Sequence, residues 1–232
     1  MRASQQRYGA LLLAIAVTFF FLGVAQPGDL QRTLGTLLVG GTLMLALVAA
    51  ETPAPRLRLA GAVIAVIVAA VIIASLTSHS ETAQGVAALA TALLVAVAPP
   101  ALVLGLMRHL RRARMITIPI VAGVLCLYLL LGLFFAFAFI AIQNLGGGPF
   151  FSNGDRVNSN TSIYFSFVTM TTVGYGDLTA RTSLGHTIAV TEALLGQIYL
   201  VTVVAAIVSR LVPSGAPQPG GDQPHTAERP SA

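Results

Sequence analysis

The chain has 232 residues, of which 56% are hydrophobic and 9% are charged, and its mean hydropathy is +0.84. A soluble core of this length cannot bury so much apolar surface, so the composition excludes a soluble globular protein and indicates that lipid surrounds most of the chain. The 13 basic residues outnumber the 8 acidic ones, but the arginines flank apolar segments, so we expect no nucleic acid as a partner.

Six apolar segments approach or exceed the length that crosses a bilayer, which is about 20 residues. They are Gly9 to Ala25, Thr33 to Ala50, Leu59 to Leu76, Ala83 to Met107, Met115 to Ile142 and Ser183 to Ser209. We therefore predict an all-α integral membrane protein with six transmembrane helices. The first segment follows Arg2 and Arg7 and also resembles a signal peptide, but its length favours a retained helix.

The arginines are distributed unevenly between the two sides of this zigzag. Three lie on one side, at positions 32, 156 and 181, and ten lie on the other, at positions 2, 7, 56, 58, 108, 111, 112, 114, 210 and 229. Cytoplasmic loops of membrane proteins carry the excess of basic residues. We therefore predict a multi-pass protein of the cell membrane with both termini in the cytoplasm.

The fourth segment resembles a voltage-sensing helix only in its place along the chain. Ala83 to Met107 contains no basic residue, and the cluster Arg108, Arg111, Arg112 and Arg114 follows it. Voltage sensing needs charges within the membrane field, so we expect this cluster to be a cytoplasmic anchor. Anionic headgroups attract such a cluster, which makes membrane lipid a predicted partner.

A different pattern separates the fifth and sixth segments, where about forty residues intervene. Ser159, Asn160 or Thr161 is suited to cap a short helix that runs to Met170. Its apolar and aromatic content indicates burial within protein at membrane depth, so we predict a re-entrant helix. The carboxy-terminal end of that helix carries a partial negative charge, which favours a cation near the membrane centre.

The run that follows this helix alternates glycine with larger residues: Thr172, Val173, Gly174, Tyr175 and Gly176. Glycine adopts backbone angles that are closed to other residues, so the two glycines allow consecutive carbonyl groups to turn toward one axis. Rings of such carbonyls replace the hydration shell of K⁺. One chain cannot enclose the ion, so we predict a four-fold homotetramer with K⁺ as the permeant ion and no cofactor.

The side chains of Val173 and Tyr175 are then expected to turn away from this axis. Tyr164 and Phe165 of the short helix are their expected packing partners.

Residues from about 115 to 211 resemble the pore domain of the potassium channel family, with an outer helix, a pore helix, a filter loop and an inner helix. Seven consecutive residues, Thr171 to Asp177, carry the resemblance. It implies that K⁺ sites are lined by the carbonyl oxygens of Thr172, Val173, Gly174 and Tyr175 and by the Thr172 hydroxyl. It also implies that Gly176 completes the filter and that Asp177 lies at the outer mouth.

Two residues of the sixth segment are candidate functional residues. Glu192 is the only acidic residue within a predicted membrane helix, and we expect it to hydrogen-bond the pore helix or the filter backing. The alternative is that it attracts ions in the cavity. Gly196 lies where the family commonly has a hinge glycine, but a glycine there also permits close helix packing.

The sequence thus predicts three parts: a four-helix bundle over 1–114, a pore domain over 115–212 and a disordered cytoplasmic tail over 213–232. We expect a channel that conducts K⁺ passively and selectively and is not gated by voltage. It is either a leak channel or one gated by lipid, tension or pH. The alternative is a regulatory or scaffold subunit of a partner channel. We expect no enzyme, since no carboxylate pair, metal-ligand spacing or activated nucleophile is present.

Overall fold

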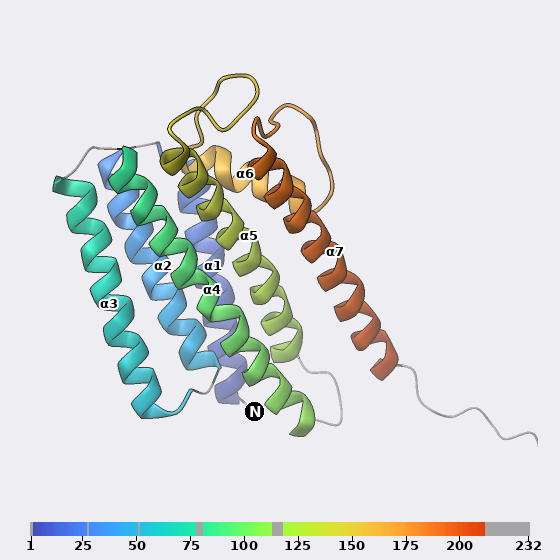
Figure 1. Ribbon diagram of the computed structural model, residues 1–232. Coiled ribbons are helices and arrows are strands. Elements are labelled where there is room, and N and C mark those ends of the chain that lie inside the picture. Colours follow the sequence, from blue (N-terminus) through green and yellow to red (C-terminus); the bar gives the residue numbers. More distant parts are fainter. Residues whose placement is uncertain (1, 27, 51, 78–80, 113–117, 212–232) are drawn as a thin grey trace, which may run out of the picture.

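The computed structural model describes residues 2–26, 28–50, 52–77, 81–112 and 118–211 (Figure 1). Within these ranges the chain forms seven helices and no strand beyond one antiparallel bridge between Phe151 and Ala180. The helices are α1 (Arg2–Val24), α2 (Asp29–Ala49), α3 (Ala54–Thr77), α4 (Glu81–Arg112), α5 (Ile118–Gly146), α6 (Ser159–Met170) and α7 (Ser183–Leu211).

All helices except the short α6 are long and apolar enough to cross a membrane, which confirms the prediction of an all-α multi-pass membrane protein. Most of the helices begin or end a few residues beyond the predicted apolar segments, because helical hydrogen bonding continues into polar flanking residues. The predicted tail over 213–232 and the boundary between the first two predicted parts lie outside the described residues.

The first five helices form a bundle that continues directly into the rest of the fold. Helix α4 packs along α5, α1 contacts α2, α5 and α6, and α3 packs on α2 and α4. Helix α6 lies across one end of the bundle, and α7 packs on α5 and α6 at the opposite side from α3 (Figure 1). The short helix α6 therefore contacts α1, α5 and α7.

Two clusters of buried side chains hold the helices together. The larger one lies among α1, α2, α4 and α5 and includes Leu11, Ile15, Leu43, Leu102 and Leu130. The second is aromatic and lies at the α6 end of the molecule, with Phe135, Phe139, Phe150, Phe151 and Phe165. Lipid is as apolar as these side chains, so close packing and interhelical hydrogen bonds stabilise the contacts rather than exclusion of water.

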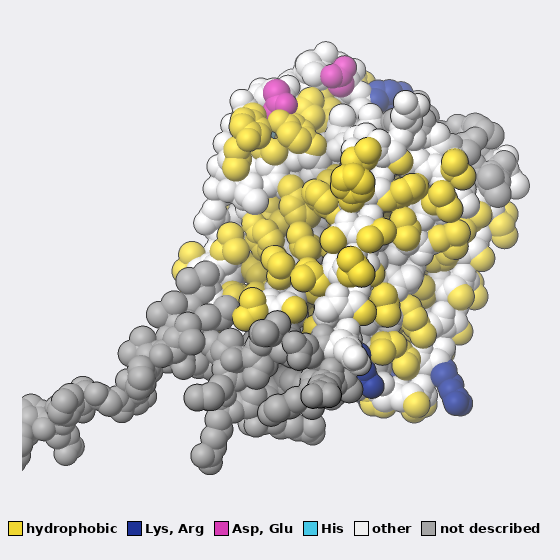
Figure 2. Space-filling model, turned by 180° about the vertical axis from the view of Figure 1, so that it is seen from behind, with side chains coloured by type: hydrophobic (Ala, Val, Ile, Leu, Met, Phe, Trp, Pro, Cys, Tyr) yellow, Lys and Arg dark blue, Asp and Glu magenta, His cyan; other side chains and the backbone are white. Residues whose placement is uncertain are grey.

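Much apolar surface remains exposed on this single chain. Figure 2 shows a broad band of hydrophobic side chains, with basic and acidic side chains at its ends. Helix α7 exposes Leu184, Val190, Leu194, Ile198 and Val201. Such a band fits the hydrocarbon layer, in which apolar side chains need no cover.

Candidate functional site

The N-cap of helix α6 lies one residue before the first of the three capping residues expected from the sequence, Ser159. Asn158 is the N-cap, and its side-chain oxygen accepts hydrogen bonds from the backbone N–H groups of Asn160 (2.9 Å) and Thr161 (3.0 Å). The Thr161 hydroxyl in turn accepts from the backbone N–H of Asn158 at 2.9 Å. This reciprocal arrangement is a capping box, in which asparagine satisfies donors as well as serine does.

The amino-terminal end of α6 is tied to the first two helices. The Gln31 side-chain amide on α2 donates to the side-chain oxygen of Asn160 and to the backbone carbonyl of Leu22 on α1, both at 3.1 Å. Gln31 is buried. The first four helices, α1 to α4, are called the N-terminal bundle below. Gln31 connects this bundle to the helix that precedes the filter run, and its partner Asn160 lies 129 residues further along the sequence.

The carboxy-terminal half of α6 lies very close to α5 and α7. A methyl group added at Gly132 on α5 would lie 2.6 Å from the Phe167 ring, and one added at Gly196 on α7 would lie 2.7 Å from the Met170 carbonyl oxygen. Both glycines therefore permit the close approach of neighbouring helices. For Gly196 this is the packing alternative considered from the sequence. Gly132 was not identified there, because glycine is common in membrane helices.

A buried hydrogen-bond cluster lies behind α6. The Ser166 hydroxyl lies 2.8 Å from the Gly132 carbonyl oxygen on α5 and also hydrogen-bonds the Glu192 carboxyl group on α7. Glu192 is fully buried, with one carboxyl oxygen engaged by Ser166 and the other without a hydrogen-bond partner among the described residues. Three helices thus meet at one serine.

The filter run leaves α6 through a tight turn. The backbone N–H of Thr172 donates to the Thr169 carbonyl at 2.9 Å, and that of Val173 donates to the Val168 carbonyl at 3.0 Å. The backbone angle φ is +58° at Thr172, +52° at Gly174 and +81° at Gly176, whereas Val173 and Tyr175 between them have negative φ. Left-handed residues therefore alternate with others along the run.

This alternation has a direct chemical consequence. In an extended strand successive residues face opposite sides, whereas alternation between left-handed and other conformations turns successive carbonyl groups toward the same side. The two glycines adopt positive φ without steric cost, but Thr172 is a β-branched residue for which it is unfavourable. Its hydroxyl accepts a hydrogen bond from the Gln197 side chain at 3.0 Å.

The outer end of the run is held by two tyrosines and an aspartate. The Tyr164 and Tyr175 rings stack with centroids 6.4 Å apart, which confirms the expected packing of Tyr175. The Tyr164 hydroxyl donates to the Asp177 carboxylate at 2.7 Å. That hydrogen bond, with smaller contributions from desolvation and from the nearby charge, raises the pKa of Tyr164 above its ordinary value.

Phe165 does not join this pair, contrary to the sequence expectation. It packs on Phe139, Phe150 and Phe151 at centroid distances of 5.0, 5.8 and 5.4 Å. Successive residues of a helix are 100° apart, so Tyr164 and Phe165 cannot both face the filter run.

The loops before α6 and after the run are joined around Gln143 on α5. Its side-chain oxygen accepts from the backbone N–H groups of Phe150 and Val157, and its amide donates to the Val157 carbonyl at 3.1 Å. The backbone N–H of Arg181 donates to the Phe150 carbonyl at 2.8 Å. Gln143 was missed from the sequence because its partners are 7 and 14 residues away in an irregular loop.

The structure therefore brings the sequence-predicted residues into one region. Thr172 to Asp177 form a continuous exposed stretch, and Glu192 and Gly196 contact α6 behind it. Within the described ranges, no group of three His, Cys, Asp or Glu side chains is placed to hold a metal ion. The oxygen ligands that this region offers along the run are backbone carbonyls and the Thr172 hydroxyl.

Comparison with known proteins agrees with this geometry. Residues 123–212 match the model of a family described as ion channel. The chain is 39% identical over 74 residues to the calcium-activated potassium channel slowpoke of Drosophila melanogaster, which is 32% of this chain and 6% of that protein. It is also 39% identical over 57 residues to probable potassium channel protein 2 of Methanocaldococcus jannaschii, which is 23% of this chain and 17% of that protein.

The matched segments thus span less than a fifth of the length of either relative, and no solved structure matches the chain. The family match falls on the carboxy-terminal part, which contains α6, the filter run and α7. Residues 123–212 of this chain are therefore similar to the ion channel family, and both relatives are named as potassium channel proteins.

Proposed function

We propose that the chain is a subunit of a potassium-selective channel that conducts K⁺ passively across the membrane. The observation that carries this proposal is the alternation of positive and negative φ from Thr172 to Gly176, on a run that leaves the carboxy-terminal end of a short internal helix. That backbone turns carbonyl oxygens toward one side, where they replace the hydration shell of a monovalent cation.

One chain supplies one wall of the conduction path, so the proposal includes a homotetramer. The carbonyl oxygens of Thr172, Val173, Gly174 and Tyr175 form the K⁺ sites, together with the Thr172 hydroxyl. Gly176 ends the filter and Asp177 lies at its outer mouth. The exposure of Val173 (53%) and Tyr175 (71%) on the single chain supports contact with neighbouring subunits.

The electrostatics of α6 favour a cation at the inner end of this path. The last carbonyl groups of a helix carry a partial negative charge, which acts within the last turn. Four such helices around one axis add their fields in a region of low dielectric. Only Thr171 separates the last residue of α6, Met170, from the proposed filter.

The proposed channel is not opened by voltage through α4. The apolar window of this helix, Thr82–Val103, contains no charged residue, so its displacement moves little charge across the field. In this arrangement both termini are cytoplasmic, α1 to α4 form the bundle of the proposed first part, 1–114, and α5 to α7 form the pore domain, 115–212. The tail over 213–232 follows the pore domain.

Reconstitution of the purified full chain into liposomes tests the proposal. We expect K⁺ flux that exceeds Na⁺ flux and is abolished by Gly174→Asp. Gly154→Asp is the matched control, because Gly154 also has positive φ (+88°) but lies in the loop before α6. Equal passage of Na⁺ and K⁺ would contradict selectivity. Flux that appears only after a partner channel is added would favour the regulatory or scaffold subunit instead.

A further inference from the structure

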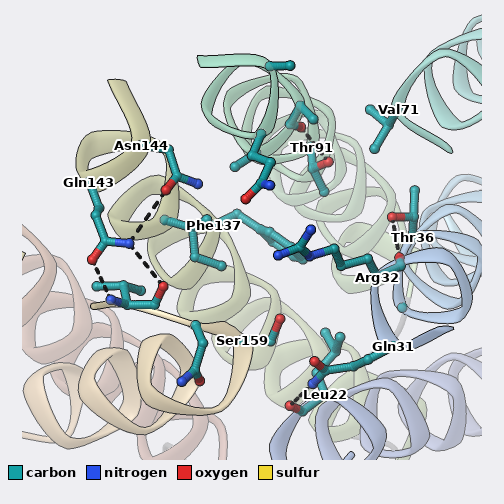
Figure 3. A pocket seen from close by; sticks show the side chains of 18 of the residues that line it. Leu22, Gln31, Arg32, Thr36, Val71, Thr91, Phe137, Gln143, Asn144 and Ser159 are labelled. Atoms are coloured by element: carbon teal, nitrogen blue, oxygen red, sulfur yellow. Dashed lines mark hydrogen bonds between the residues drawn. The ribbon is translucent and has the colours of Figure 1, made fainter. Parts of the chain in front are cut away.

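A cavity of about 450 Å³ lies between the N-terminal bundle and the loop that leads into α6 (Figure 3). Its walls come from Leu22 of α1, from α2, the last turns of α3, the first turns of α4, the last turns of α5 and residues 156–159. This volume is in the range of small-molecule sites in proteins. The cavity is separate from the proposed conduction path, since none of the residues 172–177 lines it.

One part of the cavity lining is polar and basic. Among the described residues that line it are two arginines, Arg32 and Arg156, and no acidic residue. Figure 3 shows Arg32 reaching from α2 into the cavity, with Asn144 and Gln143 on the facing wall. A guanidinium group presents a planar set of donors that matches a phosphate group in two parallel hydrogen bonds.

Another part of the lining, called the apolar wall below, consists of apolar side chains. It includes Val71 and Ala74 of α3, Ala87 of α4, and Phe137 and Ile140 of α5. The lining of α4 runs from Ala83 to Thr91, which corresponds to a depth of about 12 Å along the helix axis. A free phosphate ion contacts the arginines and leaves this apolar wall uncovered, whereas an acyl chain covers it.

We propose that this cavity binds the headgroup and upper acyl chain of an anionic phospholipid with a hydroxyl-bearing headgroup, such as phosphatidylglycerol. The guanidinium groups of Arg32 and Arg156 hold the phosphate, and the side-chain amides of the rim accept and donate hydrogen bonds to the headgroup. A headgroup that ends in an ammonium group fits less well, because the described lining offers no carboxylate to receive it. By the distribution of arginines, the lipid belongs to the outer leaflet.

The site touches the hydrogen bonds that hold α6. Gln31, which donates to Asn160, and Gln143, which holds Val157, both line the cavity, as do Asn158 and Ser159 at the start of α6. A bound lipid therefore stabilises the contact between the N-terminal bundle and the helix that precedes the filter run. This binding does not depend on the proposed conduction of K⁺.

Native mass spectrometry of the purified full chain, delipidated and then supplied with phosphatidylglycerol or phosphatidylcholine, tests the site. We expect retention of phosphatidylglycerol that falls about fivefold in Arg32→Gln or Arg156→Gln and about thirty-fold in the double variant. Arg181→Gln is the matched control, because Arg181 lies on the same side of the molecule but outside the cavity. Equal losses in the control, or retention unchanged in the double variant, would overturn the proposal.

A second pair of variants keeps both arginines and so guards against misfolding of the first pair. Ala87→Leu fills the apolar wall and is expected to lose the lipid, whereas Val86→Leu, which lies outside the cavity and is 55% exposed, is expected to retain it. Glycerol phosphate and inorganic phosphate are added as soluble competitors. We expect neither to displace the lipid at equal concentration, and displacement by either would identify a soluble phosphate as the ligand and overturn the lipid assignment.

Discussion

The hydroxyl group of Ser166 hydrogen-bonds the carboxyl group of Glu192 and lies 2.8 Å from the carbonyl oxygen of Gly132. A hydroxyl group has one hydrogen to donate, and a backbone carbonyl can only accept. When Ser166 donates to Gly132, the second hydrogen bond needs a hydrogen from the Glu192 carboxyl group. Both hydrogen bonds of the Ser166 hydroxyl are therefore satisfied when the side chain at position 192 carries a hydrogen to donate.

The first prediction concerns this cluster. Glu192→Gln is expected to retain most of the stability and K⁺ flux, because the glutamine amide N–H can donate a hydrogen bond to the Ser166 hydroxyl. Glu192→Leu and Ser166→Ala are each expected to destabilise the protein by about 1–3 kcal/mol, since they leave a buried partner unsatisfied. Thermal unfolding in detergent and flux assays measure both. A Glu192→Gln variant as unstable as Glu192→Leu would refute this hydrogen count, and altered selectivity in Glu192→Gln would favour the ion-attracting role.

A second prediction distinguishes packing from bending at Gly196. The methyl group of Gly196→Ala would lie 2.6 Å from the Met170 side chain and 2.7 Å from its carbonyl oxygen. Because backbone atoms cannot yield without moving the end of α6, we expect a loss of about 1–3 kcal/mol. Gly132→Ala is expected to cost less, since its nearest neighbours belong to the Phe167 and Met170 side chains.

Gly41→Ala is the control for both variants, because no atom lies within 4 Å of the added methyl group. The thermal unfolding midpoint should fall in the order Gly41→Ala, Gly132→Ala, Gly196→Ala. An unchanged midpoint together with altered channel opening in Gly196→Ala would show instead that this glycine is a hinge.

The hydrogen bond from Tyr164 to Asp177 leads to a third prediction, on alkaline pH. The pKa of Tyr164 is raised above its ordinary value of 10.0, mainly by this hydrogen bond. A raised pKa means that the contribution to stability is complete below the ordinary pKa of tyrosine and is lost as the pH rises through the higher folded value. We expect Asp177→Ala to return the pKa of Tyr164 toward its ordinary value.

Ultraviolet titration of tyrosinate, compared with Tyr164→Phe to identify the signal, measures this shift. An Asp177→Ala variant in which Tyr164 titrates at the same pH as in the parent would show that the hydrogen bond is absent from the folded protein.

These residues also show how far the sequence could predict the structure. The apolar segments were predictable because a membrane helix is encoded by local composition. A hydrogen bond from Glu192 to the short helix α6 was also expected, and the structure has one to Ser166. The choice of Ser166 and its contact with Gly132 were not predictable, because they depend on which helices meet. Positive φ at Gly174 and Gly176 follows from residue type, whereas at Thr172 it runs against the preference of a β-branched residue and is imposed by the turn after α6.

The last prediction concerns Gln143, the side chain that holds the loop before α6. Gln143→Met has nearly the same shape but removes the partners of the Phe150 N–H, the Val157 N–H and the Val157 carbonyl. Each buried group left unsatisfied costs about 1–3 kcal/mol, so we expect a loss of at least about 3 kcal/mol. Hydrogen exchange of the segment 147–158 should accelerate with it, because local opening frees these amides.

Gln197→Met is the matched control, since Gln197 is exposed on the single chain and donates its one described hydrogen bond to Thr172. Its effect on thermal stability should stay within about 1.5 kcal/mol, and exchange in 147–158 should not change. If Gln143→Met leaves exchange in this segment as slow as in the parent, the loop is held by the aromatic cluster around Phe150 and Phe151 rather than by Gln143. The contrast between the two variants thus separates the contribution of buried hydrogen bonds from that of aromatic packing at the entrance to α6.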